Sequence, residues 1–120
     1  MTKNGKRFKK RTQKSAIDCW FLCSKIPKSR EFNAFVNQLI RSSSSVGANF
    51  RASQRAKSTK DFINKLKIVE EEVYESMFWL EMFIEIDQDN QVEIKKLHQE
   101  ANELLAITVA SINTARRNNK

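Results

Sequence analysis

Apolar side chains recur every three or four residues between Phe62 and Ile84. The members of this stripe are Phe62, Leu66, Val69, Val73, Met77, Leu80 and Ile84. Such spacing puts one apolar face on a long α-helix, which is stable only when other helices cover that face. A flanking stripe widens the apolar surface and predicts contacts on two sides; it comprises Tyr74, Phe78, Trp79, Met82 and Ile86.

Turn-forming residues are scarce in this chain. Only 2 Gly and 1 Pro occur among 120 residues, so the frequent tight turns of a β-sandwich are missing. A chain of this length with 40% hydrophobic residues can bury one core. We therefore expect a single domain built from long helices.

Three further segments show helical patterns. Residues 13–26 carry Ile17, Trp20, Phe21 and Ser24 at helical spacing, and Pro27 ends that helix. Ser58 and Asp61 form a capping pair that begins the helix of the Phe62 stripe. Asn90 and Glu93 predict a second capping box, followed by a final helix to about residue 115.

The remaining segment contains the run RSSSSVGANF at residues 41–50. Ser and Gly are poor helix formers, which favours a loop. However, an apolar stripe that begins at Phe32 stays in phase through the run, with Ser43, Val46 and Phe50 on schedule. We interpret residues 30–55 as one helix whose small side chains let a neighbouring helix approach. A phosphate-binding loop is excluded because only one Gly is present and no strand precedes it.

Short connections between these four helices favour antiparallel neighbours. The predicted fold is all-α, an antiparallel up-down four-helix bundle over residues 13–115. Residues 1–12 and 116–120 are predicted to be basic tails.

The formal net charge of +8 is unevenly distributed. Residues 1–30 carry +9, residues 31–60 carry +4, residues 61–90 carry −7 and residues 91–120 carry +2. A basic surface of this kind suits nucleic acid, and a surface that only confers solubility is the alternative.

The densest basic cluster lies at the N-terminus, and antiparallel packing would bring the ends of the second and fourth helices together. Arg51 and Arg55 are expected to share a helix face. The candidate phosphate-binding residues are Lys9, Lys10, Arg11, Lys14, Arg41, Arg51, Arg55, Lys57, Lys60, Arg116 and Arg117.

Catalytic and metal chemistry find no support in the sequence. The single His98 cannot complete a zinc or di-metal site, and no serine can be matched to a partnered histidine. Cys19 and Cys23 are expected to be reduced thiols in or near the core. We expect no enzymatic activity, no cofactor and no metal.

The N-terminus only superficially resembles a secretory signal. Its apolar run is limited to residues 19–23, and no small-residue cleavage pattern follows. No stretch approaches the roughly 20 apolar residues that span a bilayer. The expected protein is soluble and cytoplasmic, without a membrane partner.

The central region resembles a bacterial four-helix-bundle family. That family includes proteins encoded in intervening sequences of the 23S rRNA gene and the accessory variability proteins of diversity-generating retroelements. The matching residues are Arg41, Ser45, Val46, Ala48 and Asn49, followed by Ser58, Asp61 and Phe62. Many members continue Ala-Asn with Glu-Gly, whereas this chain has Phe50-Arg51-Ala52-Ser53, which favours a longer second helix.

The resemblance implies a homopentameric, barrel-like ring without known enzymatic activity. In the retroelement branch it implies a basic surface that contacts nucleic acid and a reverse transcriptase. Our leading hypothesis is a non-enzymatic oligomer that binds RNA or DNA through backbone phosphates. The alternative is a protein-interaction scaffold, such as an accessory subunit of a reverse transcriptase, that does not itself bind nucleic acid.

Overall fold

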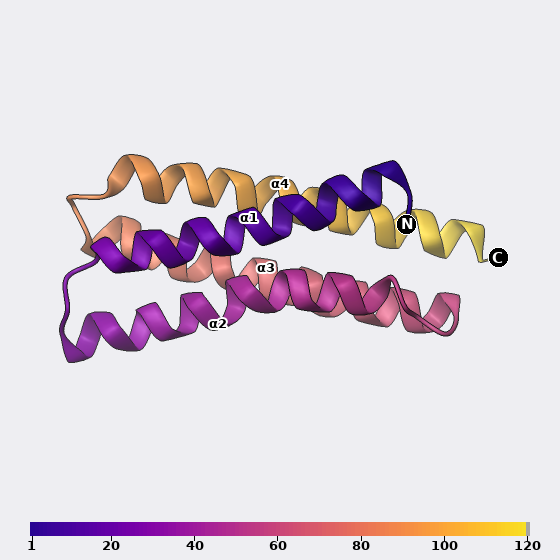
Figure 1. Cartoon of the computed structure of the whole chain (residues 1–120), viewed down its shortest axis with the longest axis horizontal. Helices are drawn as coiled ribbons and strands as arrows, with labels where there is room; N and C mark the ends of the chain where they lie inside the picture. The colour runs from indigo at the N-terminus through magenta and orange to yellow at the C-terminus, as the bar shows by residue number, and fades with distance from the viewer. Residues whose placement is uncertain (120) are drawn as a thin grey trace.

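The computed structural model describes residues 1–119 and consists of four antiparallel α-helices (Figure 1). They are α1 (Lys3–Lys25), α2 (Arg30–Ser53), α3 (Thr59–Ile86) and α4 (Gln91–Asn118). Each helix packs against two others, so that α1 and α3 are diagonal, as are α2 and α4. The bundle measures 49 × 23 × 20 Å. The all-α four-helix-bundle prediction is confirmed.

The two ends of the bundle differ in what they contain. Both termini and the α2–α3 turn lie at one end, and the α1–α2 and α3–α4 connections lie at the other (Figure 1). Dividing each helix at its midpoint gives a terminal half, residues 1–14, 42–72 and 105–119, and a loop half, residues 15–41 and 73–104.

The core runs along the whole bundle axis. In the terminal half it is built mainly around Phe8, Phe50 and Leu66, and in the loop half around Leu22, Leu39 and Phe83. Each such side chain contributes roughly 1.5–3 kcal/mol when it leaves water. The stripe predicted on α3 supplies this core, since Leu66, Val69, Val73 and Leu80 are all buried.

The serine run is helical, as its phase predicted. Ser42 and Ser43 are buried inside α2, and each hydroxyl reaches back to a carbonyl of the preceding turn. Ser44 donates to the carbonyl oxygen of Ile40 at 2.7 Å. These bonds satisfy hydroxyl groups that would otherwise be costly to bury.

Small side chains also bring the neighbouring helices close to α2. A Cβ placed on Gly47 would lie 3.3 Å from Oγ1 of Thr12 on α1, tighter than ordinary van der Waals contact. On the other side of α2, the Ser42 hydroxyl is within hydrogen-bonding distance of Ser76 on α3. The interpretation of this segment as a close-packing surface is therefore confirmed.

One of the two predicted capping motifs is present. Ser58 caps α3 by accepting from the backbone N–H of Asp61 at 3.0 Å, and the Asp61 carboxylate accepts from the N–H of Lys57 at 3.1 Å. The capping box predicted at Asn90 is wrong. Its backbone is not extended and its side chain makes no cap bond; instead, Nδ2 donates to Asp87 at 2.7 Å.

The predicted N-terminal tail is also wrong, because α1 begins at Lys3 rather than near residue 13. Thr2 caps the helix by accepting from the N–H of Gly5. Phe8 is buried, and its ring meets that of Phe50 edge-on with centroids 4.7 Å apart. A helix cap and one aromatic anchor thus hold a segment whose composition is otherwise that of a solvated tail.

At the other terminus, α4 extends beyond the predicted end. Arg116 and Arg117 lie in its last turn, where positive charge complements the helix dipole. The predicted tail over 116–120 is therefore helical through Asn118, and Lys120 lies outside the described residues.

The apolar stripe predicted on the first helix faces solvent. Trp20 and Phe21 are 57% and 55% exposed, and Ile17 is also exposed. The buried face is formed instead by Cys19, Leu22 and Cys23. This helix therefore has two apolar faces, of which only one is covered within the chain.

Candidate nucleic-acid interface

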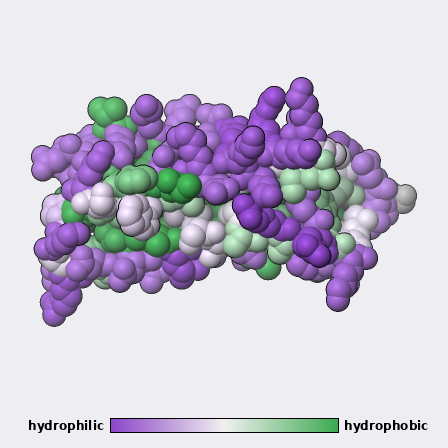
Figure 2. Space-filling view, in the orientation of Figure 1, coloured by the Kyte–Doolittle hydropathy of each residue, from purple (hydrophilic) through white to green (hydrophobic). Residues whose placement is uncertain are grey.

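Positive charge is concentrated in the terminal half. Within residues 1–119 that half contains 15 Lys and Arg against 4 Asp and Glu, whereas the loop half contains 6 against 10. The antiparallel topology causes this, because it gathers the start of α1, the α2–α3 turn and the end of α4. On the face shown in Figure 2, hydrophilic side chains project from both halves, and the most strongly hydrophobic surface lies in the loop half.

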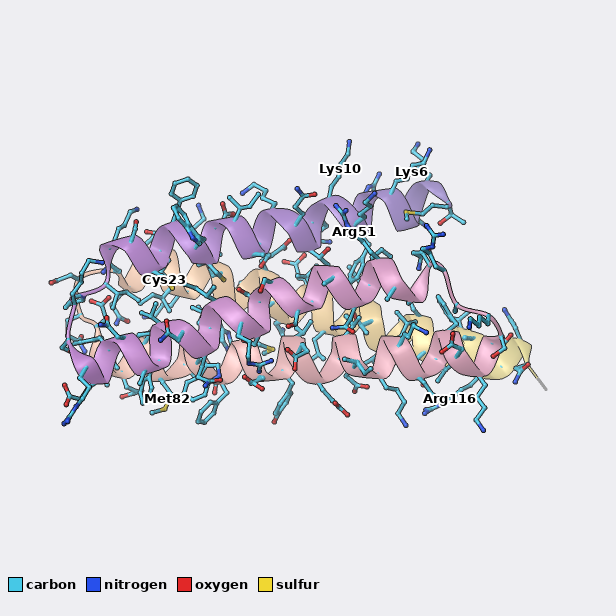
Figure 3. All side chains as sticks on the ribbon, turned by 60° about the horizontal axis from the view of Figure 1, so that its bottom comes forward. Lys6, Lys10, Cys23, Arg51, Met82 and Arg116 are labelled. Atoms are coloured by element: carbon cyan, nitrogen blue, oxygen red, sulfur yellow. The ribbon has the colours of Figure 1, made fainter. Side chains whose placement is uncertain are left out.

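The first turns of α1 carry a row of cations. Lys3, Lys6, Arg7 and Lys10 are spaced so that they share one side of the helix, and we call them the cationic ridge. Figure 3 shows Lys6 and Lys10 pointing away from the bundle. These four residues, together with Arg11 and Lys14, line a shallow hollow of about 420 Å³.

Among the predicted sites, the two cations that follow the ridge are ion-paired. Arg11 donates from Nε to Glu100 at 3.0 Å and from Nη2 at 2.6 Å, and it reaches Glu103 at 3.1 Å. Lys14 pairs with Asp18 at 2.6 Å. Arg11 therefore ties α1 to α4, and both charges are partly neutralised.

Arg41 lies in the loop half and pairs with carboxylates on α3. It contacts Glu72 at 3.1 Å and forms a second, shorter bond with Glu75. Burial alone would raise the pKa of Glu75, but hydrogen bonds from Trp79 and Arg41 lower it. Arg41 thus joins α2 to α3 and does not belong to the cations of the terminal half.

The remaining predicted cations lie in the terminal half, and none of them forms a salt bridge with a carboxylate among residues 1–119. They are Lys9, Lys10, Arg51, Arg55, Lys57, Lys60, Arg116 and Arg117. Figure 3 shows Arg51 and Arg116 in the same half of the bundle as Lys6.

The expected proximity of the second and fourth helices is found at the α2–α3 turn. One hollow of about 470 Å³ is lined by Lys57 from the turn and by Ala115 and Asn118 from α4. The expectation that Arg51 and Arg55 share a helix face is wrong. Arg55 follows the C-cap residue Gln54 and lies in the turn.

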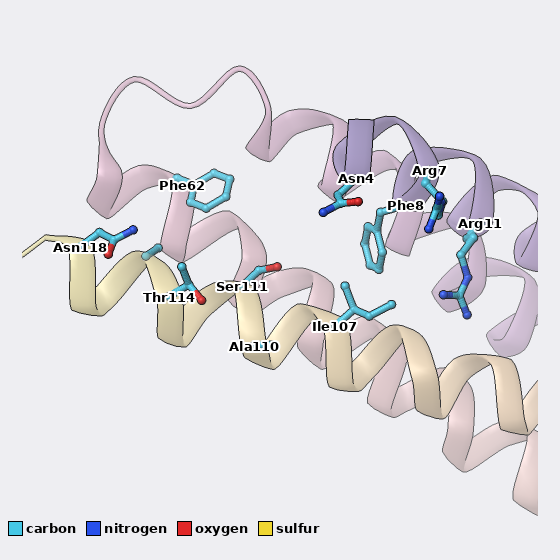
Figure 4. A pocket seen from close by; sticks show the side chains of 11 residues that line it. Asn4, Arg7, Phe8, Arg11, Phe62, Ile107, Ala110, Ser111, Thr114 and Asn118 are labelled. Carbon is cyan, nitrogen blue, oxygen red and sulfur yellow. The ribbon is translucent and has the colours of Figure 1, made fainter. Parts of the chain in front are cut away.

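A cleft of about 670 Å³ opens between α1 and α4 in the terminal half (Figure 4). Phe8, Phe62, Ile107 and Ala110 are among its apolar lining residues, and Arg7 stands at its rim. None of its eleven described lining residues is acidic. The interface between α1 and α4 is the smallest of the four helix–helix interfaces, and the cleft lies along it.

Sequence reasoning missed this cleft and part of the ridge. A disordered tail over residues 1–12 would place no helix opposite Ile107, whereas the first turns of α1 lie there. The helical spacing of Lys3, Arg7 and Lys10, together with the lone apolar Phe8, could have revealed that α1 starts early and carries the ridge, but it gives no sign of the cleft.

A model of the family described as 23S rRNA-intervening sequence protein matches residues 6–110. The chain belongs to this family. The match begins inside the cationic ridge, in the segment predicted to be a tail.

A solved relative shares the fold of this chain. It is a crystal structure from Bacteroides thetaiotaomicron, described as a protein of unknown function from the S23 ribosomal protein family. The two chains are 27% identical with a TM-score of 0.80, over 88% of this chain and 97% of the other. No curated protein is significantly similar in sequence.

The family-motif residues of this chain make contacts that shape α2 and α3. Val46 is buried, and Asn49 donates from Nδ2 to the carbonyl oxygen of Ser45 at 2.8 Å, whereas Ala48 is exposed. Ser58 and Asp61 begin α3, and Phe62 then lines the cleft.

Other reactive groups of the protein are engaged or buried. His98 Nε2 lies 2.8 Å from Glu81 Oε2, and Cys19 and Cys23 are free and buried. Within residues 1–119 no group of three His, Cys, Asp or Glu side chains could hold a metal ion. Over the same residues, no helix combines the length and apolar character that a bilayer span requires.

Proposed function

We propose that this protein is a non-enzymatic oligomer that binds RNA or DNA through backbone phosphates on its terminal half. The observation that carries the proposal is the charge separation along the bundle, with unpaired cations gathered where the termini and the α2–α3 turn meet. Contacts of Lys and Arg with phosphates release condensed counterions, so they bind without reading sequence. The proposal assigns the protein to the cytoplasm, where free thiols stay reduced.

Two uncovered apolar faces support the oligomer. Trp20 and Phe21 are exposed on α1, and Tyr74 and Phe78 are exposed on α3. The two faces lie on diagonal helices. Contact between the α1 face of one copy and the α3 face of the next joins two different surfaces and is therefore heterologous. Heterologous contacts form rings when the rotation closes. The family resemblance suggests five copies.

A ring would also strengthen phosphate binding. Cyclic symmetry gives every copy the same orientation to the ring axis, so the terminal halves would combine into one positive face. Several weak contacts on one ligand then act together, which raises the apparent affinity. The apolar faces occupy the loop half and the middle of the bundle, which leaves the cationic ridge accessible.

Two matched double variants test the proposal. Lys6→Glu with Lys10→Glu reverses two charges in the ridge, and Lys95→Glu with Lys96→Glu reverses two exposed lysines on α4 in the loop half. Fluorescence anisotropy with a labelled oligonucleotide at 50 mM salt measures affinity. We expect the ridge variant to lose at least about tenfold and the control less than about threefold. Equal losses, or no binding by the unmodified protein, would contradict the proposal.

The second candidate function is a protein-interaction scaffold, for example an accessory subunit of a reverse transcriptase. The exposed Trp20 and Phe21 pair favours it, because aromatic residues are enriched at protein interfaces. A partner that co-purifies after complete nuclease treatment, and is lost in Trp20→Glu, would support this candidate. A partner released by the nuclease would instead support binding through nucleic acid.

A further inference from the structure

We propose that the preferred ligand is a single nucleic-acid strand, or an unpaired loop, with phosphates along the cationic ridge and bases in the α1–α4 cleft. This inference rests on the proposed function and specifies its ligand. The observation that supports it is that the cationic ridge lies directly beside an apolar cleft without acidic lining residues.

The hollow beside the cationic ridge and the cleft share lining residues. Arg7 and Arg11 line both the hollow beside the ridge and the cleft. The two features are therefore neighbours on the surface of α1. Figure 4 shows Arg7 and Arg11 on the α1 side of the cleft, with Ile107 on the α4 side. A nucleic-acid strand has the same two-sided character, with charged phosphates on one side and flat bases on the other.

The spacing of the ridge suits a strand. Residues three and four apart on a helix have Cβ atoms about 5–6 Å apart, and long Lys and Arg side chains adapt that spacing to successive phosphates. Lys3, Arg7 and Lys10 therefore form a short, nearly straight series of phosphate contacts. Lys14 would extend the series if a phosphate displaced Asp18.

The cleft suits bases. Its volume of about 670 Å³ falls within the roughly 300–1,000 Å³ of typical small-ligand pockets. Phe62, Ile107 and Ala110, which are exposed or half-buried, provide apolar surface for the faces of a base. The edges of a base need hydrogen-bonding groups, which the cleft offers from Asn4, Ser111, Thr114 and Asn118.

A duplex would use the ridge but leave the cleft empty. Its base faces are stacked and its hydrogen-bonding edges are paired, so none can enter without unpairing. An unpaired strand has both surfaces available, and burying them adds an apolar contribution to the phosphate contacts. The single strand is therefore expected to bind more tightly than a duplex of equal length.

The test compares three labelled ligands of 20 nucleotides at one salt concentration: a thymidine strand, an abasic strand with the same phosphates, and a duplex. Ala110→Phe fills the cleft from an exposed position on α4, and Thr114→Phe fills it from a second position. Ala34→Phe, at an exposed site on α2 in the loop half, is the matched control. Circular dichroism verifies that each variant is folded.

We expect the thymidine strand to bind at least about fivefold more tightly than the abasic strand. Ala110→Phe and Thr114→Phe should remove this difference, and Ala34→Phe should keep it. Equal affinity for the two strands, or a difference that both cleft variants preserve, would overturn the inference. Competition by polyglutamate as strong as by the strand would overturn it too.

These outcomes separate the inference from the proposed function. If all three ligands bind equally and Lys6→Glu with Lys10→Glu weakens all of them, phosphate binding stands and base insertion is wrong. If no ligand binds at low salt, both proposals fail.

Discussion

The hydroxyl oxygens of Ser42 on α2 and Ser76 on α3 lie 2.9 Å apart in the centre of the bundle, and both residues are buried. Ser76 also bonds to the carbonyl oxygen of Glu72. Within residues 1–119 no buried side-chain nitrogen or oxygen is left without a partner. The pair therefore lets two helices approach closely without the cost of an unsatisfied polar group.

A larger side chain at this contact should separate the helices. Ser42→Leu is expected to lower the free energy of unfolding by about 1–3 kcal/mol, because the core has no room for the added atoms. Ser44→Leu, two positions along on an exposed site, should change it by less than about 0.5 kcal/mol. Denaturant unfolding at fixed protein concentration measures both. Equal effects would show that α2 is not closely packed at Ser42.

Phase in the sequence was sufficient to predict α2 through its serine run. Val46 and Phe50 keep the helical spacing of the apolar stripe that begins at Phe32. This continuous periodicity outweighs the low helix propensity of the serines and glycine in the run. The same reasoning failed on α1, because Trp20 and Phe21 belong to an outward face. Periodicity identifies an apolar face but does not say which neighbour covers it.

Arg41 should contribute to stability rather than to binding. Arg41→Gln removes both contacts with α3, so we expect a lower melting temperature and an affinity for nucleic acid within about twofold of the unmodified protein. Thermal unfolding and anisotropy measure the two effects. A large loss of affinity with unchanged melting would contradict this assignment.

The stability difference caused by Arg41→Gln should depend on pH. The hydrogen bonds from Trp79 and Arg41 hold the pKa of Glu75 below its ordinary value of 4.5, despite the opposing effect of burial. The stabilisation is therefore present above pH 4.5 and is lost as the pH falls through the folded-state pKa. The difference in melting temperature should be constant between pH 6 and 8 and shrink in acid. A difference that grows on acidification would contradict the pairing.

The two thiols should be unreactive in the native protein. Burial raises the pKa of Cys19 to about 12 and that of Cys23 to about 11, from an ordinary value of 9.0. Because the thiolate is the nucleophile, labelling at pH 8 should be at least about 100-fold slower than in the denatured chain. The same shifts stabilise the fold fully below pH 9, and this contribution is lost as the pH rises toward 11–12. Native labelling at the denatured rate would contradict the burial.

The apolar α1 face should hold the oligomer together. Light scattering of the unmodified protein is expected to give a multiple of the 14.0 kDa chain mass. Trp20→Glu should reduce that mass, because it places a charge in an apolar contact. Val92→Glu changes an apolar residue on α4 that is even more exposed than Trp20, at 77% against 57%, and that belongs to neither face, so it should leave the mass unchanged. A monomeric unmodified protein would contradict the ring.

The candidate site was only partly predictable from sequence. The choice of a basic surface followed from composition, and antiparallel topology then brought the α2–α3 turn to the end of α4. Ion pairing depends on which helices are adjacent, so the pairing of Arg41 with Glu72 could not be read from spacing. The cleft was unpredictable for a similar reason, since it requires Phe8 and Ile107 to face each other across two helices distant in sequence.

The salt dependence of binding tests the central claim most directly. Four contacts by Lys3, Lys6, Arg7 and Lys10 with a single strand predict a slope of log affinity against log salt of about −3 per protomer. The same measurement on Lys6→Glu with Lys10→Glu should give a slope shallower by about half. An affinity independent of salt, or a slope that the double variant leaves unchanged, would contradict binding through phosphates at the cationic ridge.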